Sequence, residues 1–241
     1  MNRPTMVPPS FGNVFEDILE VLWAPSTVFE RSRYRTFGKY MLVLFLVCAV
    51  VTVITAKLTG PWLDATFDLS MQQAAARGQT IPPEAMATAR KFGSVGFYFS
   101  PLFVVVLGGF VGGLLLLLGS KIAQASVTYG QAVFIAVMGS MPRILGLLAS
   151  AVMGLVMDGE KARSLFDLSI GPARFVDAAK TSPVLMQLLA GLDLFNLWQL
   201  VIFGVGMAVV GRVSRSSGFL AALVAWVIGT ALPLLPTLLT R

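Results

Sequence analysis

The sequence predicts an all-α polytopic integral membrane protein, a bundle of five transmembrane helices preceded by an N-terminal amphipathic helix. Three observations support this fold class. The 241 residues are 56% hydrophobic and only 12% charged, whereas soluble domains carry about 25% charged residues. The apolar residues fall in long blocks, and a helix needs about 20 such residues to cross a membrane. None of these blocks alternates with period two, as the strands of a membrane barrel do.

The first predicted region is a cytoplasmic N-terminal segment, residues 1–39. Its stretch FGNVFEDILEVLW places apolar side chains at helical spacing and acidic side chains on the other side (Phe15, Ile18, Leu19 and Leu22 against Glu16, Asp17 and Glu20). This pattern is typical of a helix that lies on the bilayer surface, and a partner-binding helix is the alternative. We expect no cleavable signal peptide, because the first apolar block begins about forty residues into the chain.

A single membrane domain, residues 40–239, is predicted to hold the five apolar blocks. Their backbone groups must pair within each segment in lipid, so each block must be a helix. The start of the fourth helix is open between Pro183 and Leu194. The predicted helices are about 40–58, 96–119, 131–157, 188–211 and 218–239.

Basic residues near the helix ends predict the orientation. They crowd the entry to the first helix, follow the second, and fill the turn before the last (Arg31, Arg33, Arg35, Lys39, Lys121, Arg212 and Arg215). By the positive-inside rule, we expect a cytoplasmic N-terminus, and the expected location is the cell (inner) membrane. The net charge of +6 fits anchoring to anionic membrane lipids, and no nucleic-acid motif is present.

The residue types argue against an enzyme. The chain has no histidine and a single cysteine, Cys48, and it lacks a phosphate-cradling Gly-rich loop. The stretch DGEKARSLFDLSIG, residues 158–171, resembles part of the CDP-alcohol phosphotransferase signature. That chemistry needs several carboxylates on divalent metal, and the further aspartates of the signature are absent. We therefore expect no catalytic residue, no cofactor and no metal site.

Small residues form stripes on three of the predicted helices. Membrane helices associate through close backbone approach at such stripes. The pattern favours packing within one bundle, and a homo-oligomer formed through one stripe is the alternative. The helix-packing candidates are Gly108, Gly109, Gly112 and Gly113 in the second helix and Gly146, Ser150 and Gly154 in the third; Ala221, Ala225 and Gly229 repeat the pattern in the fifth.

Three stretches carry a family resemblance. LLAGLDLFNLWQLVIFGVGMAVVGRVSRSSGFLAALVAWVIG, residues 188–229, combines Asp193, Phe195 and Trp198 with a short turn and an alanine-rich last helix. YGQAVFIAVMGSMPRILGLL, residues 129–148, has a Gly-Gln entry and a mid-helix proline, and VLWAPSTVFERSR forms the lead-in. Together they resemble the bacterial branch of the Ypt/Rab-interacting protein (YIP) family.

The resemblance implies five membrane helices and a cytoplasmic N-terminus. Eukaryotic members bind Rab GTPases and carry a DLYGP motif before the first helix. DLSIGP, residues 167–172, is only superficially similar, because it lies between the third and fourth helices. The resemblance therefore indicates a fold rather than a function.

The third helix contains a proline and an arginine, Pro142 and Arg143, near its middle. Proline frees the carbonyl of Met138, and a central arginine costs about 2.5–3.5 kcal/mol on insertion scales. We expect Arg143 to face the interior, bond freed carbonyls and pair with Asp193. Asn196 and Gln199 would complete this buried polar centre, which serves either as a structural latch or as part of a solute pathway.

Two functions follow from these patterns. The first is a non-enzymatic membrane scaffold or organiser of the YIP family that acts through lipids or through membrane or cytoplasmic proteins. The alternative is a small transporter or channel with a polar centre around Arg143 and Asp193. A continuous cavity that reaches Arg143 favours transport, whereas a dry, packed centre favours the scaffold.

Overall fold

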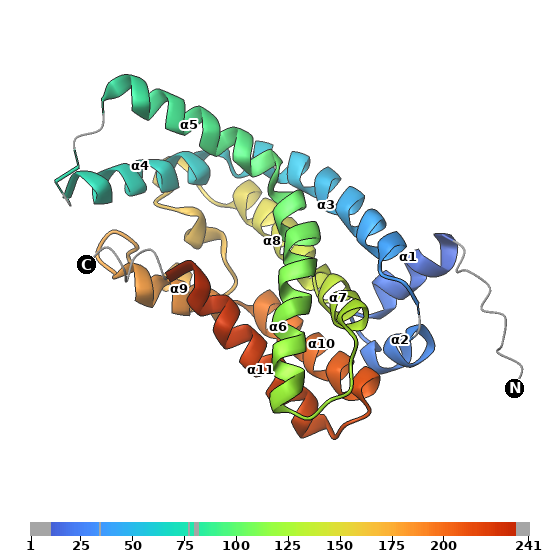
Figure 1. Cartoon of the computed structure of the whole chain (residues 1–241). Coiled ribbons are helices and arrows are strands. Elements are labelled where there is room, and N and C mark those ends of the chain that lie inside the picture. Colours follow the sequence, from blue (N-terminus) through green and yellow to red (C-terminus); the bar gives the residue numbers. More distant parts are fainter. Residues whose placement is uncertain (1–10, 34, 77, 80–81, 235–241) are drawn as a thin grey trace, which may run out of the picture.

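The computed structural model describes residues 11–33, 35–76, 78–79 and 82–234 (Figure 1). Four of its helical segments are long and apolar enough to cross a membrane: Gly38–Leu58, Leu102–Ile122, Tyr129–Val156 and Leu194–Gly211. A shorter apolar helix, Arg215–Ala231, follows them. These segments correspond to the five predicted helices, and the fold class of a helical membrane bundle is confirmed. Residues 235–239, the expected end of the fifth helix, lie outside the described residues.

The chain begins with two short helices, α1 (Phe11–Glu20) and α2 (Pro25–Ser32), before the first long helix, α3 (Gly38–Leu58). These short helices share one core with the bundle. Val14, Ile18 and Phe29 are buried in it, and the Phe29 ring meets Phe134 edge to face at 5.9 Å between centroids. Half of the Phe15 side chain remains exposed. One face of the N-terminal segment is therefore packed into the protein, and its place on the bilayer surface stays a prediction.

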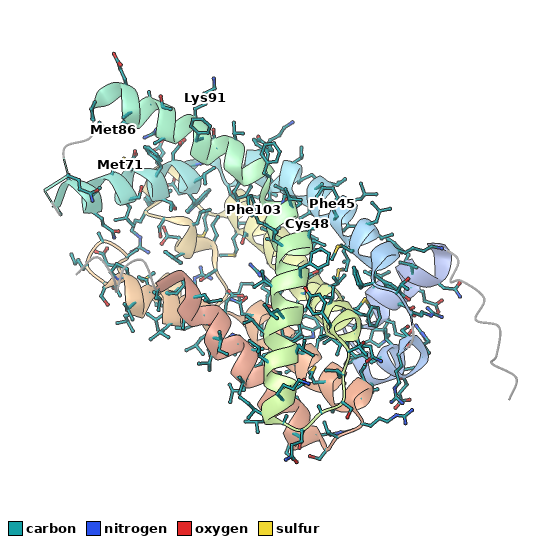
Figure 2. All side chains as sticks on the ribbon, in the orientation of Figure 1. Phe45, Cys48, Met71, Met86, Lys91 and Phe103 are labelled. Carbon is teal, nitrogen blue, oxygen red and sulfur yellow. The ribbon has the colours of Figure 1, made fainter. Side chains whose placement is uncertain are left out.

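Two helices that the sequence pattern did not indicate follow α3. They are α4 (Gly60–Ala76) and α5 (Pro83–Tyr98), a hairpin that projects from the bundle (Figure 1). Both have too many polar residues for a membrane block, yet alanine, methionine and glutamine favour helix throughout. Arg90 of α5 holds the pair together, since it bonds Asp64 at 3.1 Å and also Asp68 on α4. Lys91 points away from the bundle (Figure 2).

The second membrane segment begins with a π-helical turn, η1 (Leu102–Leu107), and continues as α6 (Gly108–Ile122). Gly109, Gly112 and Gly113 of this helix lie against α7 (Tyr129–Met138). A Cβ atom at Gly113 would lie 2.6 Å from Cγ2 of Val133, and one at Gly109 would lie 2.9 Å from Cγ2 of Val137. The two helices thus approach more closely than larger side chains would allow, and this part of the α6 stripe is used within the chain.

The third predicted helix is broken into α7 and α8 (Met141–Val156). The last turn of α7 closes with Gly139 N donating to Ile135 O at 2.9 Å and Ser140 N donating to Val137 O at 3.1 Å. Pro142 has no N–H to donate to Met138, so the regular ladder stops there. Further along α8, Gly146 packs on the Phe195 ring, and a Cβ at Gly154 would lie 2.6 Å from the Leu58 carbonyl oxygen.

The last third of the chain returns across the bundle. Three short 3₁₀ turns, η2 (Gly159–Lys161), η3 (Leu165–Leu168) and η4 (Pro172–Phe175), lead to α9 (Pro183–Gly191). Helix α10 (Leu194–Gly211) and α11 (Arg215–Ala231) with its terminal turn η5 (Leu232–Leu234) follow. The fourth predicted helix is therefore two helices, which meet at Leu192 and Asp193.

Candidate functional site: a polar cavity beside Arg143

Arg143 lies near the middle of the Tyr129–Val156 membrane segment. Helices surround Arg143, but its side chain has a large accessible surface, because it borders two cavities between them. The break at Gly139 and Ser140 places it in the first turn of α8. Within the described part of the chain, Arg143 has no hydrogen bond and no ion pair. The bonds to freed carbonyls expected from the sequence are therefore not formed.

A cavity of about 380 Å³ lies on one side of Arg143. We call it the α6–α11 cavity, because those helices form much of its wall. Gly108 and Gly112 leave room on α6, and Ala225 and Gly229 do so on α11. Its polar lining comes from Arg143, Gln187, Asn196, Gln199 and Thr230. Its volume falls in the range of small-molecule pockets, about 300–1,000 Å³.

A second cavity of about 220 Å³ also borders Arg143. It lies between α8 and α10, and we call it the α8–α10 cavity. Gly146 and Ser150 line it from α8, Asp193 and Asn196 line it from the α9–α10 junction, and Ile170 closes it from the η3–η4 segment. Small residues that were predicted to serve helix packing thus also provide open space at this level of the bundle.

The predicted ion pair between Arg143 and Asp193 is wrong. Asp193 is the N-cap of α10: its Oδ1 accepts from Phe195 N at 2.9 Å, and its Oδ2 accepts from Ile170 N at 2.8 Å. The reason is the break in the fourth helix, which puts Asp193 at a helix start, where a carboxylate satisfies free N–H groups. Both oxygens are engaged there, and the guanidinium of Arg143 is left without them.

The polar centre is therefore assembled differently from the prediction. Arg143, Asn196 and Gln199 meet around the α6–α11 cavity, whereas Asp193 borders only the α8–α10 cavity. Asn196 donates from Nδ2 to the Ala190 carbonyl at 2.9 Å, which ties α10 to the end of α9. Its amide oxygen carries no hydrogen bond from a described residue. Whether this centre has a functional role stays a prediction.

Beyond the cavities, the helices pack tightly at the end of the bundle where α10 turns into α11. At that end of the bundle, a Cβ at Gly119 of α6 would lie 2.3 Å from the Ala221 carbonyl oxygen of α11, and a Cβ at Gly218 would lie 2.5 Å from the Gly204 carbonyl oxygen of α10. In Figure 1, α6 and α11 lie close at their lower ends and separate toward α9.

No cluster of three or more acidic, histidine or cysteine side chains suitable for a metal ion occurs among the described residues. In the phosphotransferase-like loop, Asp158 pairs with Lys161 at 3.1 Å, and Asp167 bonds Arg163 at 2.8 Å. Both carboxylates pair with basic residues of the same loop. The described part of the chain brings no further carboxylates beside them that would complete the phosphotransferase signature.

A second polar cluster, at Asp17, was missed by the sequence reasoning. The pattern placed Asp17 on the solvent side of its helix, but its carboxylate is buried. It accepts from Arg31 Nε at 2.7 Å, from Arg35 Nη1 at 2.6 Å and from the Tyr40 hydroxyl at 2.6 Å. Burial lowers the pKa of Arg31, but hydrogen bonds to Glu20 and Asp17 outweigh this effect, so its pKa lies above the usual value. The run of arginines before α3 was the available signal.

Comparisons with known proteins match nearly the whole length of the chain. The family model described as the Yip1 domain matches residues 19–235. The chain is similar to "Membrane protein YknW" of Bacillus subtilis (strain 168), with 23% identity over 211 residues that cover 85% of this chain and 82% of the relative. No solved structure gives a significant match. The matched segment includes every residue that lines the two cavities.

Proposed function

Because the chain belongs to the Yip1 domain family, as its sequence predicted, we propose that it is a non-enzymatic membrane protein that moves or binds a small anionic solute beside Arg143. The observation that carries this proposal is an arginine near the centre of a membrane segment, without an ion pair to any described residue and open to a cavity. A guanidinium at this depth costs several kcal/mol unless water or an anion reaches it. This feature favours the transporter that the sequence left as the alternative.

Two broken helices support the same proposal. Secondary transporters build midplane sites where membrane helices are discontinuous, with helix N-termini directed at anionic groups. Here α7 breaks before α8, and α9 breaks before α10. Asp193 at the second break lines the α8–α10 cavity, and Arg143, in the first turn of α8 after the first break, lines both cavities.

The proposal is tested by anion flux from proteoliposomes. Vesicles that contain the purified protein are loaded with chloride, phosphate, sulfate or lactate, and efflux is followed against protein-free vesicles. We expect efflux of at least one anion to depend on the protein and to be lost in Arg143→Gln. Lys180→Gln removes an exposed positive charge that pairs with Asp177 and serves as the matched control. Equal efflux from wild type and Arg143→Gln would exclude a pathway at Arg143.

The scaffold role remains the second candidate, because of helix α5. Most of its side chains are exposed, including the large apolar residues Met86, Phe92 and Val95. A 16-residue helix with so little tertiary packing gains little from its own fold, so a protein or lipid partner would stabilise it. Cross-linking and affinity capture from native membranes with Phe92→Glu would test this role. A partner captured by wild type and lost in that variant would support the scaffold.

A further inference from the structure

A further pocket lies at the end of the bundle that carries the N-terminal helices. Its volume is about 490 Å³. It is formed where three separate parts of the chain meet: α2 ends, the connection from α6 to α7 crosses, and α10 turns into α11. The pocket is lined by Arg33, Gln124, Ser126, Gln131 and Arg212, together with backbone and apolar atoms of 210–213. No acidic side chain contributes to this lining.

Arg33 is held in place but is incompletely satisfied. Its Nη2 donates to the Val209 carbonyl at 2.6 Å, and its own carbonyl accepts from Gln131 Nε2 at 3.2 Å. Its Nε is buried and has no hydrogen-bond partner among the described residues. A buried donor without a partner costs about 1–3 kcal/mol or more when charged. The guanidinium is therefore held in place beside the pocket, and its buried Nε is left unsatisfied by the described residues.

The backbone of the pocket adds a second observation. Gln124 and Arg212 have φ angles of 54° and 55°, and no other non-glycine residue in the described ranges has a positive φ. Each follows a helix end and closes it, because Ala125 N donates to Ser120 O at 2.9 Å and Val213 N donates to Ala208 O at 3.1 Å. Glycine is the residue best suited to this closing position. A side chain there costs about 1–2 kcal/mol through strain, and both side chains face one pocket.

We propose that this pocket binds the phosphate of an anionic phospholipid headgroup, with Arg33 and Arg212 as its cationic ligands and Gln124 as a neutral donor. Arginine suits phosphate because its planar fork donates two parallel hydrogen bonds. The strained Gln124 is then retained for binding, since glycine would close α6 at lower cost. This site is separate from the cavity at Arg143 and does not depend on the transport proposal.

The position of the pocket favours a lipid over a soluble phosphate. Two membrane segments end beside it, at Ile122 and Gly211, so the pocket lies at the level where headgroups begin. Basic pockets between membrane helices at this level bind acidic headgroups. The neighbouring Arg215 is exposed and does not line the pocket, which makes it a control for general attraction between positive charge and anionic lipid.

The test measures binding of phosphatidylglycerol to detergent-purified protein by native mass spectrometry and by the shift in Tm. Phosphatidylcholine and inorganic phosphate are the comparison ligands. We expect phosphatidylglycerol to bind the wild type best and to bind Arg33→Gln about fivefold more weakly, since one arginine near the membrane surface contributes about 1 kcal/mol. Arg215→Gln should bind like the wild type. Equal losses in the two variants would overturn the proposal, and stabilisation by inorganic phosphate equal to that by the lipid would overturn the lipid as its source.

Glycine variants keep the proposal testable if Arg33→Gln does not fold. Gln124→Gly relieves the positive-φ strain at that position, so it should raise Tm in the absence of lipid, and Arg212→Gly removes a cationic ligand. Each should bind phosphatidylglycerol more weakly than the wild type. A variant that is more stable but binds the lipid more weakly would not be expected if the replaced side chain had a purely structural role. Unchanged binding in both glycine variants would show that these side chains serve no ligand.

Discussion

Arg143 and Asp193 border one cavity of about 220 Å³ without forming an ion pair. Both oxygens of the Asp193 carboxylate accept backbone N–H groups instead, from Ile170 and Phe195. Each residue therefore has its own role: the aspartate starts α10 and fastens the preceding loop to it, while the arginine supplies positive charge to open space. Because the two residues do not pair, replacing Arg143 should not lower the stability of the protein, as the loss of an ion pair would.

The first prediction concerns these two residues. Asp193→Ala should destabilise the protein by about 0.5–2 kcal/mol, the usual loss for an N-cap. Arg143→Leu should leave stability unchanged or raise it, because the charge within the membrane segment has no partner to lose. Unfolding in detergent with a double-mutant cycle checks both effects. We expect the two changes in unfolding free energy to add within about 0.5 kcal/mol. A coupling energy of several kcal/mol would show that the ion pair forms after all.

The second prediction concerns water around Arg143. In a Cys48→Ala background, cysteine at Ser150 lines the α8–α10 cavity, whereas cysteine at Leu148 lies on the exposed apolar surface of α8. A membrane-impermeant thiol reagent needs water and a thiolate. Ser150→Cys should therefore be labelled in intact membranes and Leu148→Cys should not. The reverse result would mean that the cavity is dry.

The third prediction concerns the Asp17 cluster. Asp17→Ala leaves the positive charges of Arg31 and Arg35 without their buried partner, and a broken buried ion pair typically costs about 3–5 kcal/mol. Tyr40→Phe removes only the hydroxyl that donates to Asp17 and should cost about 1 kcal/mol. Glu16→Ala, at an exposed position on the same helix, is the control. Comparable, small losses in all three variants would contradict a buried cluster.

The fourth prediction tests the contact between α6 and α7. A methyl group at Gly113 would lie 2.8 Å from the backbone of Val133, so the helices would have to move apart. Gly113→Ala should destabilise the protein by about 1–3 kcal/mol, as overpacking usually does. Gly130→Ala places the same methyl group on α7, where no atom lies within 4 Å, and should be neutral. Equal Tm values for the two variants would refute the close approach.

The fifth prediction tests the orientation expected from the basic residues. Single cysteines at Ser126 and Ser216 and at Ser70 and Ser94 all occupy exposed positions, in the Cys48→Ala background. With the N-terminus cytoplasmic, an impermeant reagent outside intact cells should label the second pair and spare the first. The opposite pattern would invert the topology.

Much of the fold was predictable, because membrane helices can be recognised from length and hydropathy alone. The breaks were harder to locate. Pro142 signalled one of them, but Asp193 was read as a residue inside a helix, since the apolar run continues through it from Val184 onward. Helix α4 was missed for the opposite reason: its polar side chains hide helical propensity from a search for apolar blocks.

The candidate site was predictable in its residues and not in its contacts. Arg143, Asn196 and Gln199 were identified because polar groups in apolar runs are costly and rare. Their partners depend on rotation and depth, which hydropathy does not specify. Asp17 shows the same limit: helical spacing placed it with Glu16 and Glu20, yet the later arginines and Tyr40 draw it into the core.

The core shared by the first and last helices has a consequence for biosynthesis. Trp198 Nε1 donates to the Leu22 carbonyl, and Arg33 donates to the Val209 carbonyl, across 176 residues of chain in each case. At about 5–20 residues per second, a ribosome needs roughly 10–35 s to make that length. During this interval the face of α2 that packs on α10 lacks its partner. We expect a chaperone or the membrane surface to cover that face until α10 has been made.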